Sequence, residues 1–186
     1  MLNGIPRFTM LAAAGAALAA APASACAQRD RAQGDRGPTR IDSTFAFEKG
    51  SSVDVGVASG EIVITGWARP EAKVHASTER GWFDAQLSSH RITIGTRSDR
   101  GRSGETRIEI SVPVGTRVQA NSASGDIHIS GTGGEVEAGS ASGSIEVTDA
   151  ADRINVHTVS GELHAAKLRG RSRLGTTSGD LTAEDV

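Results

Sequence analysis

Three residues able to bind transition metals occupy every eighteenth position in one part of the chain: His128, Glu146 and His164. Imidazole nitrogens and carboxylate oxygens are common zinc ligands. Each of the three occupies the same position in a short alternating segment, and segments stacked as strands would lie about 4.8 Å apart. Side chains on a flat strand surface converge poorly on one ion. The pattern therefore indicates a solvated polar column, and no metal site is predicted.

Carboxylates also recur beside turns, so acid–base chemistry on sugars has to be considered. Glycoside hydrolysis needs two carboxylates that flank a groove, and Asp126, Glu146 and Glu162 would be the candidates in a carbohydrate-active enzyme on a β-helix scaffold. The acidic residues are scattered, and the chain contains no GxSxG, P-loop, HExxH or CxxC motif. We predict a non-enzymatic protein with no catalytic residues and no cofactor. The carbohydrate-active enzyme remains the alternative.

Calcium-binding β-rolls are also built from nonapeptides, and their aspartates face the ion at each turn. The equivalent strand positions in this chain hold Ile129, Ala138 and Val147. Aliphatic side chains offer calcium no oxygen ligand. The sequence therefore excludes calcium binding of that type.

A repeat supplies the elements that position these side chains. A Ser-Gly pair recurs with an 18-residue period, an alternating apolar segment follows each pair, and a weaker copy lies half a period later. Alternation predicts strands, glycine permits a tight corner, and stacked turns bury what one hairpin leaves exposed. The predicted fold class is all-β, a single-stranded β-solenoid with 18-residue turns. Its structural corner residues are Ser124 and Gly125, Ser142 and Gly143, Ser160 and Gly161, and Ser178 and Gly179.

Stacking in register predicts inward columns, because a slip by one residue would exchange the two faces of every strand. A column of hydroxyl side chains is expected at the corner, as a ladder: Ser122, Ser140, Thr158 and Thr176. Four further columns are apolar apart from one serine. They are Val118, Val136, Ile154 and Ser172; Ala120, Ala138, Val156 and Leu174; Ile127, Ile145, Leu163 and Leu181; and Ile129, Val147, Ala165 and Ala183.

The segment before the repeats, residues 43–113, is predicted to form a β-rich N-terminal capping layer, continuous with the solenoid of residues 114–186. Ser59 and Gly60 align with Ser124 and Gly125, the first later Ser-Gly pair, which predicts a first turn followed by an insertion. The insertion holds three predicted strands, over residues 73–77, 91–96 and 107–112. After the leader, the large aromatic residues all lie in this segment, where they either plug the solenoid or form a ligand surface: Phe45, Phe47, Trp67, Trp82 and Phe83.

The N-terminus carries export signals. Residues 1–25 are predicted to be a signal peptide, because Arg7 precedes an apolar run that ends in Ala23-Ser24-Ala25. Residues 26–42 are polar and predicted to be a disordered tether. Cys26 is either the lipidation site of a lipoprotein or part of the discarded leader, and we favour the second, a free periplasmic or extracellular protein. No later segment is long and apolar enough to span a bilayer.

The amino-acid composition limits the classes of binding partner that the protein can have. The 186 residues include 20 Lys and Arg against 22 Asp and Glu, so there is no basic surplus to recruit nucleic acid. Aromatic residues make up 3% of the chain and glycine contributes 23 residues, which suits thin stacked layers. The strand edges of the last turn are predicted to be open, and open edges pair readily. Self-association, a covering partner and further turns in a longer chain are the alternatives there.

The ordered set of strands resembles the bacterial putative-adhesin β-strand-repeat family, or toastrack domain, a domain of unknown function. The resemblance is carried by residues 60–64, by residues 108–113 and by the SGxIxI repeats, over about residues 43–186. It implies an envelope-associated protein and brings no catalytic residues. The implied function is a structural, adhesin-like module that contacts an envelope protein or a surface polymer. A lipoprotein involved in envelope stress sensing is the alternative.

Overall fold

Thirteen β-strands make up the described part of the protein. The computed structural model describes residues 37, 39–98 and 104–186, and within these ranges there is no helix, hence none that could cross a membrane. In chain order the strands are β1 (Arg40–Ala46), β2 (Ser52–Trp67), β3 (Glu71–Thr78), β4 (Trp82–Leu87), β5 (Arg91–Arg97), β6 (Thr106–Pro113), β7 (Arg117–Ser130), β8 (Val136–Ser142), β9 (Ile145–Thr148), β10 (Ala151–Ser160), β11 (Leu163–Ala166), β12 (Arg169–Ser178) and β13 (Leu181–Glu184).

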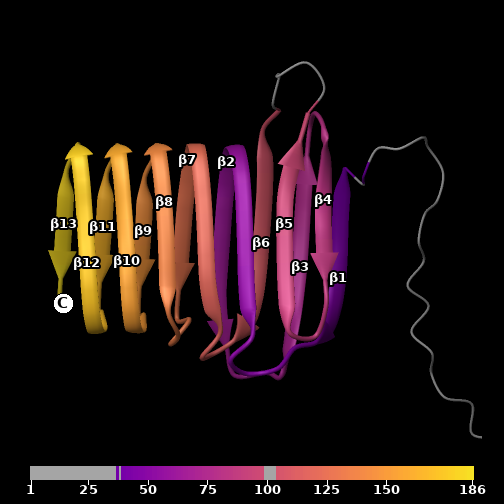
Figure 1. Ribbon diagram of the computed structural model, residues 1–186, viewed down its shortest axis with the longest axis horizontal. Helices are drawn as coiled ribbons and strands as arrows, with labels where there is room; N and C mark the ends of the chain where they lie inside the picture. Colours follow the sequence, from indigo (N-terminus) through magenta and orange to yellow (C-terminus); the bar gives the residue numbers. More distant parts are fainter. Residues whose placement is uncertain (1–36, 38, 99–103) are drawn as a thin grey trace, which may run out of the picture. The chain divides into compact units, whose positions relative to one another are not determined.

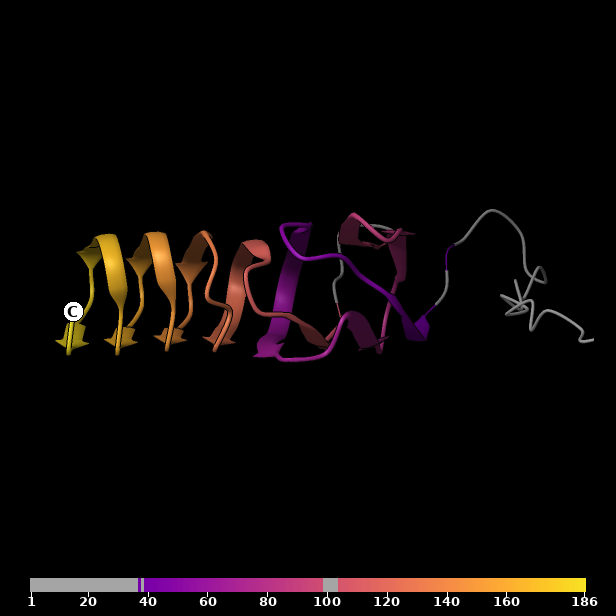
Figure 2. The same cartoon turned by 90° about the horizontal axis from the view of Figure 1, so that it is seen from below.

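Two layers of strands stack along one axis (Figures 1 and 2). The long strands β2 and β7 each bend at a Ser-Gly corner and so belong to both layers: residues 52–56 of β2 pair with β5, whereas residues 61–67 pair with β6. The first layer has the order β4-β5-β2-β7-β8-β10-β12, and the second has the order β1-β3-β6-β2-β7-β9-β11-β13. The chain is an all-β solenoid, as predicted.

The register between turns is parallel and follows the repeat. β2 pairs with β7 so that Ser59 lies beside Ser124 and Gly60 lies beside Gly125. The later turns pair exactly one repeat apart, from Val118 with Val136 to Leu163 with Leu181. The predicted first turn and the register of all four columns are therefore confirmed, although Leu181 and Ala183 in the last turn are exposed and not buried.

Close contact between backbones explains the glycines at the corners. A Cβ atom on Gly125 would lie 2.0 Å from the carbonyl oxygen of Gly60, and a Cβ atom on Gly143 would lie 2.3 Å from that of Gly125. Gly60 and Gly143 also have positive φ angles, 125° and 149°, which side-chain-bearing residues rarely adopt. A side chain here would push neighbouring turns apart.

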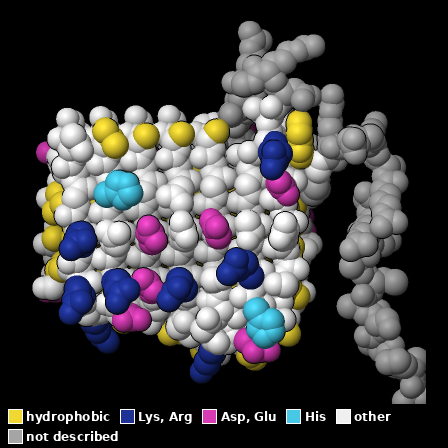
Figure 3. Space-filling view, viewed as in Figure 1, with side chains coloured by type: hydrophobic (Ala, Val, Ile, Leu, Met, Phe, Trp, Pro, Cys, Tyr) yellow, Lys and Arg dark blue, Asp and Glu magenta, His cyan; other side chains and the backbone are white. Residues whose placement is uncertain are grey.

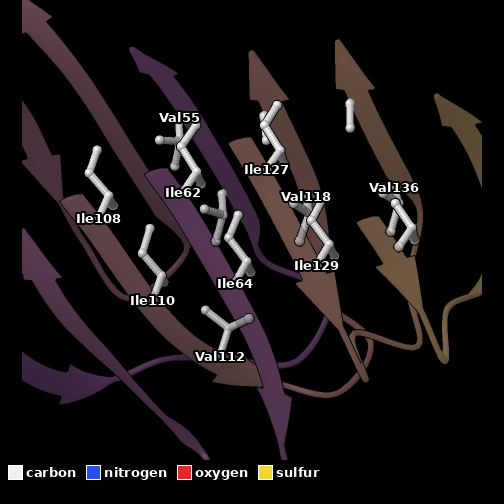
Figure 4. Packing of buried hydrophobic residues seen from close by; sticks show 14 of the residues in the cluster. Val55, Ile62, Ile64, Ile108, Ile110, Val112, Val118, Ile127, Ile129 and Val136 are labelled. Carbon is white, nitrogen blue, oxygen red and sulfur yellow. The ribbon is translucent and has the colours of Figure 1, made fainter. Parts of the chain in front are cut away.

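Aliphatic side chains fill the space between the two layers of strands (Figure 4). Ile62, Ile64 and Ile127 have no exposed surface, and the apolar members of the inward columns are buried as far as β11. In the last turn, Leu174 is partly buried and Leu181 is exposed. Full burial of one such side chain stabilises the fold by about 1.5–3 kcal/mol. The hydrophobic core is therefore a thin layer that follows the axis along which the turns stack.

The insertion extends the two layers of the solenoid. β5 and β6 pair in parallel with the two halves of β2, and β4 and β3 then pair antiparallel with β5 and β6. The three strands predicted for the insertion lie within β3, β5 and β6. β4 was not predicted. Phe47 and Phe83 are buried among these strands, Phe45 packs partly against the core, and Trp67 and Trp82 are half-buried.

The predicted tether needs one correction at its C-terminal end. β1 begins at Arg40, so residues 40–42 lie in a strand that pairs antiparallel with β3. Ile41 is buried, and its burial, together with the ladder to β3, explains why this segment is ordered. The signal peptide and, within the tether, residues 26–36 and 38, which include Cys26, lie outside the described residues.

Candidate functional site

Outward side chains form one flat face on each layer, and the two faces differ in charge. The face of the first layer carries four arginines at one strand position, which we call the arginine column: Arg91, Arg117, Arg153 and Arg171. Ser52 on β2 occupies the same position, and so does Glu135, which directly precedes β8. Figure 3 shows Lys and Arg side chains gathered towards the C-terminal turns of this face.

The carboxylate of Glu135 forms ion pairs with the two arginines on either side of it in the arginine column. Glu135 Oε2 lies 2.8 Å from Arg117 Nη2, and Glu135 Oε1 lies 3.4 Å from Arg153 Nη1. The arginines are well exposed, and exposed pairs of this kind contribute about 0–1 kcal/mol each. Among the described residues, no ion pair involves the three arginines of β12, which we call the β12 arginines: Arg169, Arg171 and Arg173. This end of the face therefore keeps its positive charge.

A shallow groove with a volume of about 570 Å³ follows the arginine column from Arg91 on β5 to Asp152 on β10. Arg91 and Arg117 line it, and the small Ser52 lies between their strands. Asp54 and Glu135 line it as well. With guanidinium and carboxylate groups together, the groove favours neither anions nor cations.

The face of the second layer is acidic. Glu61, Asp126, Glu162 and Asp180 share one strand position, with Arg107 on β6 paired to Glu61 at 2.6 Å. The Asp126 carboxylate accepts a hydrogen bond of 2.9 Å from the backbone N–H of Ser144 one turn along. Strand pairs about 4.8 Å apart place Asp126 and Glu162 roughly 10 Å from each other.

The sequence singled out carboxylates for glycan chemistry, and the structure places them on this flat acidic face. Asp126 and Glu162 lie along one line of the sheet, and Glu146 lies in the neighbouring column. None of the three lines the groove on the first layer. Across the described ranges, they are not set on opposite walls of a cleft.

The histidine and glutamate column also lies on the acidic face. His128 Nδ1 lies 3.0 Å from Glu146 Oε2, and His164 pairs in register with Glu146 on the next turn. In the part of the chain that the structure describes, no three His, Cys, Asp or Glu side chains come together as a metal site would require. The arrangement makes an ion pair when His128 is protonated.

The predicted hydroxyl column lies inside the corner, but it is not a hydrogen-bonded ladder. Ser140 and Thr158 are buried, at 4% and 2% exposure. Among the described residues, no hydrogen-bond partner is found for the hydroxyl oxygens of Ser122, Ser140, Thr158 and Thr176. In the first turn, Val57 takes the same position, paired with Ser122. The column is therefore a packing position at which β-branched and small residues fit.

The Ser-Gly corners line up as one edge of the stack. Ser59 donates a hydrogen bond of 3.3 Å to the carbonyl oxygen of Gly104. The serines of the later corners, from Ser124 to Ser178, are exposed to solvent. These serines recur because each turn bends at the same position. No contact among the described residues indicates a catalytic or binding role for them.

The combination of a first turn, an insertion and 18-residue repeats corresponds to a known family. Residues 48–186 match the family model described as Toastrack DUF4097. The chain belongs to this family. The toastrack match begins at Glu48, directly after β1, and covers the insertion together with every repeat.

Solved structures are similar to this toastrack chain at low sequence identity. A putative cell adhesion protein from Clostridium sporogenes is 8% identical, with a TM-score of 0.56, over 78% of this chain and 99% of that one. A putative adhesin from Bacteroides fragilis is 10% identical, with a TM-score of 0.34, over 79% of this chain and 97% of that one. The first of these shows a likeness of fold alone. No curated protein matches this toastrack chain.

The sorting of charge between the two faces is the feature that sequence reasoning missed. The sequence predicted a solvated polar column at His128, Glu146 and His164, and these residues lie in register on the outward face of the second layer. The sequence contains a signal for this sorting, because arginine occurs in the first nonapeptide of three turns, at Arg117, Arg153 and Arg171. The turn of β8 is the exception, with Glu135 at that position, and acid recurs in the second nonapeptide, as in Glu162 and Asp180. The two nonapeptides of a toastrack turn lie on opposite layers, which separates the charges.

Proposed function

We propose that this toastrack protein is an exported, non-enzymatic interaction module of the cell envelope, and that it binds an anionic surface polymer through the face of its first layer. The observation that carries the proposal is the cluster formed by the β12 arginines and Arg153 at the C-terminal end of that face. Strands β10 and β12 together carry four arginines and one acidic residue, Asp152.

The spacing of the cluster suits a polymer better than a small molecule. Arg153 and Arg171 are directly paired on neighbouring strands, so their backbones lie about 4.8 Å apart. A guanidinium group forms paired hydrogen bonds with a carboxylate or phosphate. Each exposed contact is weak, but a chain that carries many anionic groups makes several contacts at once.

Export and the absence of catalysis have separate support. The predicted signal peptide favours export, and the C. sporogenes structure of similar fold is that of a putative cell adhesion protein. The candidate carboxylates Asp126 and Glu162 lie on an open face, which favours binding over glycan cleavage. The proposed face functions equally well whether Cys26 anchors the protein or is removed.

The test measures binding of the mature chain to an immobilised polyuronate, with neutral dextran as the comparison. The triple variant Arg153→Gln/Arg171→Gln/Arg173→Gln is expected to lose roughly tenfold in affinity, about 1.4 kcal/mol. Binding of the unchanged protein is expected to weaken with added salt. The matched control Arg107→Gln removes an arginine from the acidic face and should leave the affinity unchanged. Equal binding by the triple variant, or equal binding to dextran, would refute the proposal.

A further inference from the structure

Every Asn and Gln residue of the described ranges lies on the outward face of the first layer. We call these four residues the amide set: Gln86 on β4, Gln119 and Asn121 on β7, and Asn155 on β10. Gln86, Gln119 and Asn155 share one row of strand positions across the layer, and Asn121 lies in the neighbouring row. Within the described ranges, the face of the second layer carries no amide side chain. Amide groups are therefore sorted between the two faces, as charge is.

The amide set has no internal hydrogen-bond partners. Among the described residues, no side-chain hydrogen bond involves any of its four members. Each side-chain amide carries two N–H donors and one carbonyl acceptor, and a hydroxyl group likewise donates and accepts. The face of the first layer therefore offers hydrogen bonds that suit a partner rich in hydroxyl groups.

Glycines recur in the row that contains Asn121, although the backbone conformation does not require them. Gly95 on β5, Gly56 on β2, Gly139 on β8 and Gly175 on β12 occupy this glycine row. None of the four has a positive φ angle, and a Cβ atom on Gly56 or Gly175 would meet nothing within 4 Å. Glycine inside a strand is less stable than alanine, and it often marks a place that a ligand approaches closely.

The amide set and the arginine column meet in the shallow groove. Gln119 lines this groove together with Arg91 and Arg117, and so does Asp54, which pairs in register with Gln119. The carboxylate of Asp54 repels an anionic group but accepts hydrogen bonds from hydroxyl groups. A partner that fits this surface therefore combines anionic groups, which the arginines attract, with hydroxyl groups.

We propose that the anionic polymer is an acidic polysaccharide, which lies across the strands with its sugar rings over the glycine row and its hydroxyl groups bonded to the amide set. This inference rests on the proposed function, because the β12 arginines and Arg153 supply the attraction for the acidic groups. The glycine row crosses six neighbouring strands from β5 to β12, a distance of about 24 Å at about 4.8 Å per strand. A chain of several sugars thus makes many weak contacts at once.

Two immobilised polyanions separate the recognition of sugar from the attraction of charge: polyuronate, and polyacrylate, which has carboxylates but no hydroxyl groups. The wild-type chain is expected to bind polyuronate roughly fivefold more tightly than polyacrylate. Asn121→Ala/Asn155→Ala should lose about fivefold in affinity for polyuronate and keep its affinity for polyacrylate. The matched control Ser130→Ala/Thr148→Ala removes two hydroxyl groups from the face of the second layer and should change neither affinity.

The glycine row supplies a second variant, which separates binding from folding. Gly56→Thr/Gly175→Thr adds bulk where a Cβ atom meets nothing within 4 Å, so it should weaken polyuronate binding without lowering the melting temperature. Retained polyuronate affinity in this variant or in the amide variant overturns the inference. Equal wild-type affinity for the two polymers overturns it as well, and leaves the proposed function standing. A wild-type chain that binds neither polymer overturns the proposed function itself.

Discussion

The two ends of the stack differ in how they finish the layers. At the N-terminal end, β1, β3 and β4 pair antiparallel, and Phe47 and Phe83 are buried there at 1% exposure each. At the C-terminal end, β12 and β13 keep the parallel register of the turns before them, and Leu181 is 42% exposed. A turn of this solenoid therefore supplies only part of its own burial, and the next turn supplies the rest. At the N-terminal end, antiparallel strands and the buried side chains of Phe47 and Phe83 take the place of a neighbouring turn.

Removal of aromatic bulk from the N-terminal end should have the largest effect. Phe83→Ala is expected to reduce the free energy of unfolding by roughly 3–5 kcal/mol, because it leaves a cavity that rigid strands cannot close. Urea unfolding followed by tryptophan fluorescence measures the change. Phe45→Ala, at a partly buried position, should cost clearly less. A loss below about 1 kcal/mol for Phe83→Ala would mean that the aromatic residues do not close this end.

One inward column allows the same truncation to be made at two depths. Ile127→Ala, in the middle of the stack, is expected to cost about 2–5 kcal/mol. Leu181→Ala, in the same column at the last turn, is expected to cost less than about 1 kcal/mol, because its side chain is already exposed. Both values come from urea unfolding at the same low protein concentration. Equal losses would show that Leu181 is covered in solution.

The corner glycines test whether contact between backbones limits the stack. Gly125→Ala places a Cβ atom against the Gly60 carbonyl and is expected to cost about 1–3 kcal/mol through forced separation of the turns. Gly56→Ala is the matched control, since its Cβ atom would meet nothing within 4 Å. Thermal unfolding should separate the two variants, and similar melting temperatures would contradict the close-contact explanation.

The hydroxyl column offers a substitution with the opposite sign. Thr158→Val should raise the free energy of unfolding by up to about 1 kcal/mol, because a buried hydroxyl without a partner is replaced by a methyl group of similar size. The first turn already has Val57 in this column. Thr148→Val, on the outward side of β9, should change little. Destabilisation by Thr158→Val would indicate that the hydroxyl group is hydrogen-bonded in solution.

The smallest expected effect is on stability at low pH, through the contacts of Asp42 in the N-terminal edge strand β1. The hydrogen bond from Arg40, and next that from His75, lowers the pKa of Asp42 below its ordinary value of 3.8. A carboxyl whose pKa falls on folding adds stability above its unfolded pKa, and this contribution is lost as the pH falls through the folded pKa. Asp42→Asn should therefore flatten the acid limb of the stability curve slightly below about pH 4. An unchanged acid limb would mean that these groups do not hold β1.

The sequence was most informative where it repeats. The strict 18-residue period predicted the parallel register and the inward columns, because any slip would expose Ile127 and Ile145. Strands β1 and β4 occur once each, and short alternating segments such as residues 40–46 and 82–87 resemble loop sequence when no copy exists to compare. The alternation of apolar and polar residues is the same in parallel and antiparallel strands. The sequence pattern therefore did not indicate that strand direction reverses in the insertion. Unpaired hydroxyls depend on distances between side chains, which spacing along the chain does not provide.

The ladders that join one turn to the next also determine how the molecule would respond to force. Their hydrogen bonds point along the stack axis, so a pull along that axis opens them like a zipper, one turn after another. Within the described stack, the turn formed by β12 and β13 has ladders on one side only and a partly exposed core, and it would open before the other described turns. Each opened turn frees one full repeat of extended chain, a length of up to about 60 Å. A protein held at one end and bound at the other would thus lengthen in steps and absorb mechanical work before its remaining turns come apart.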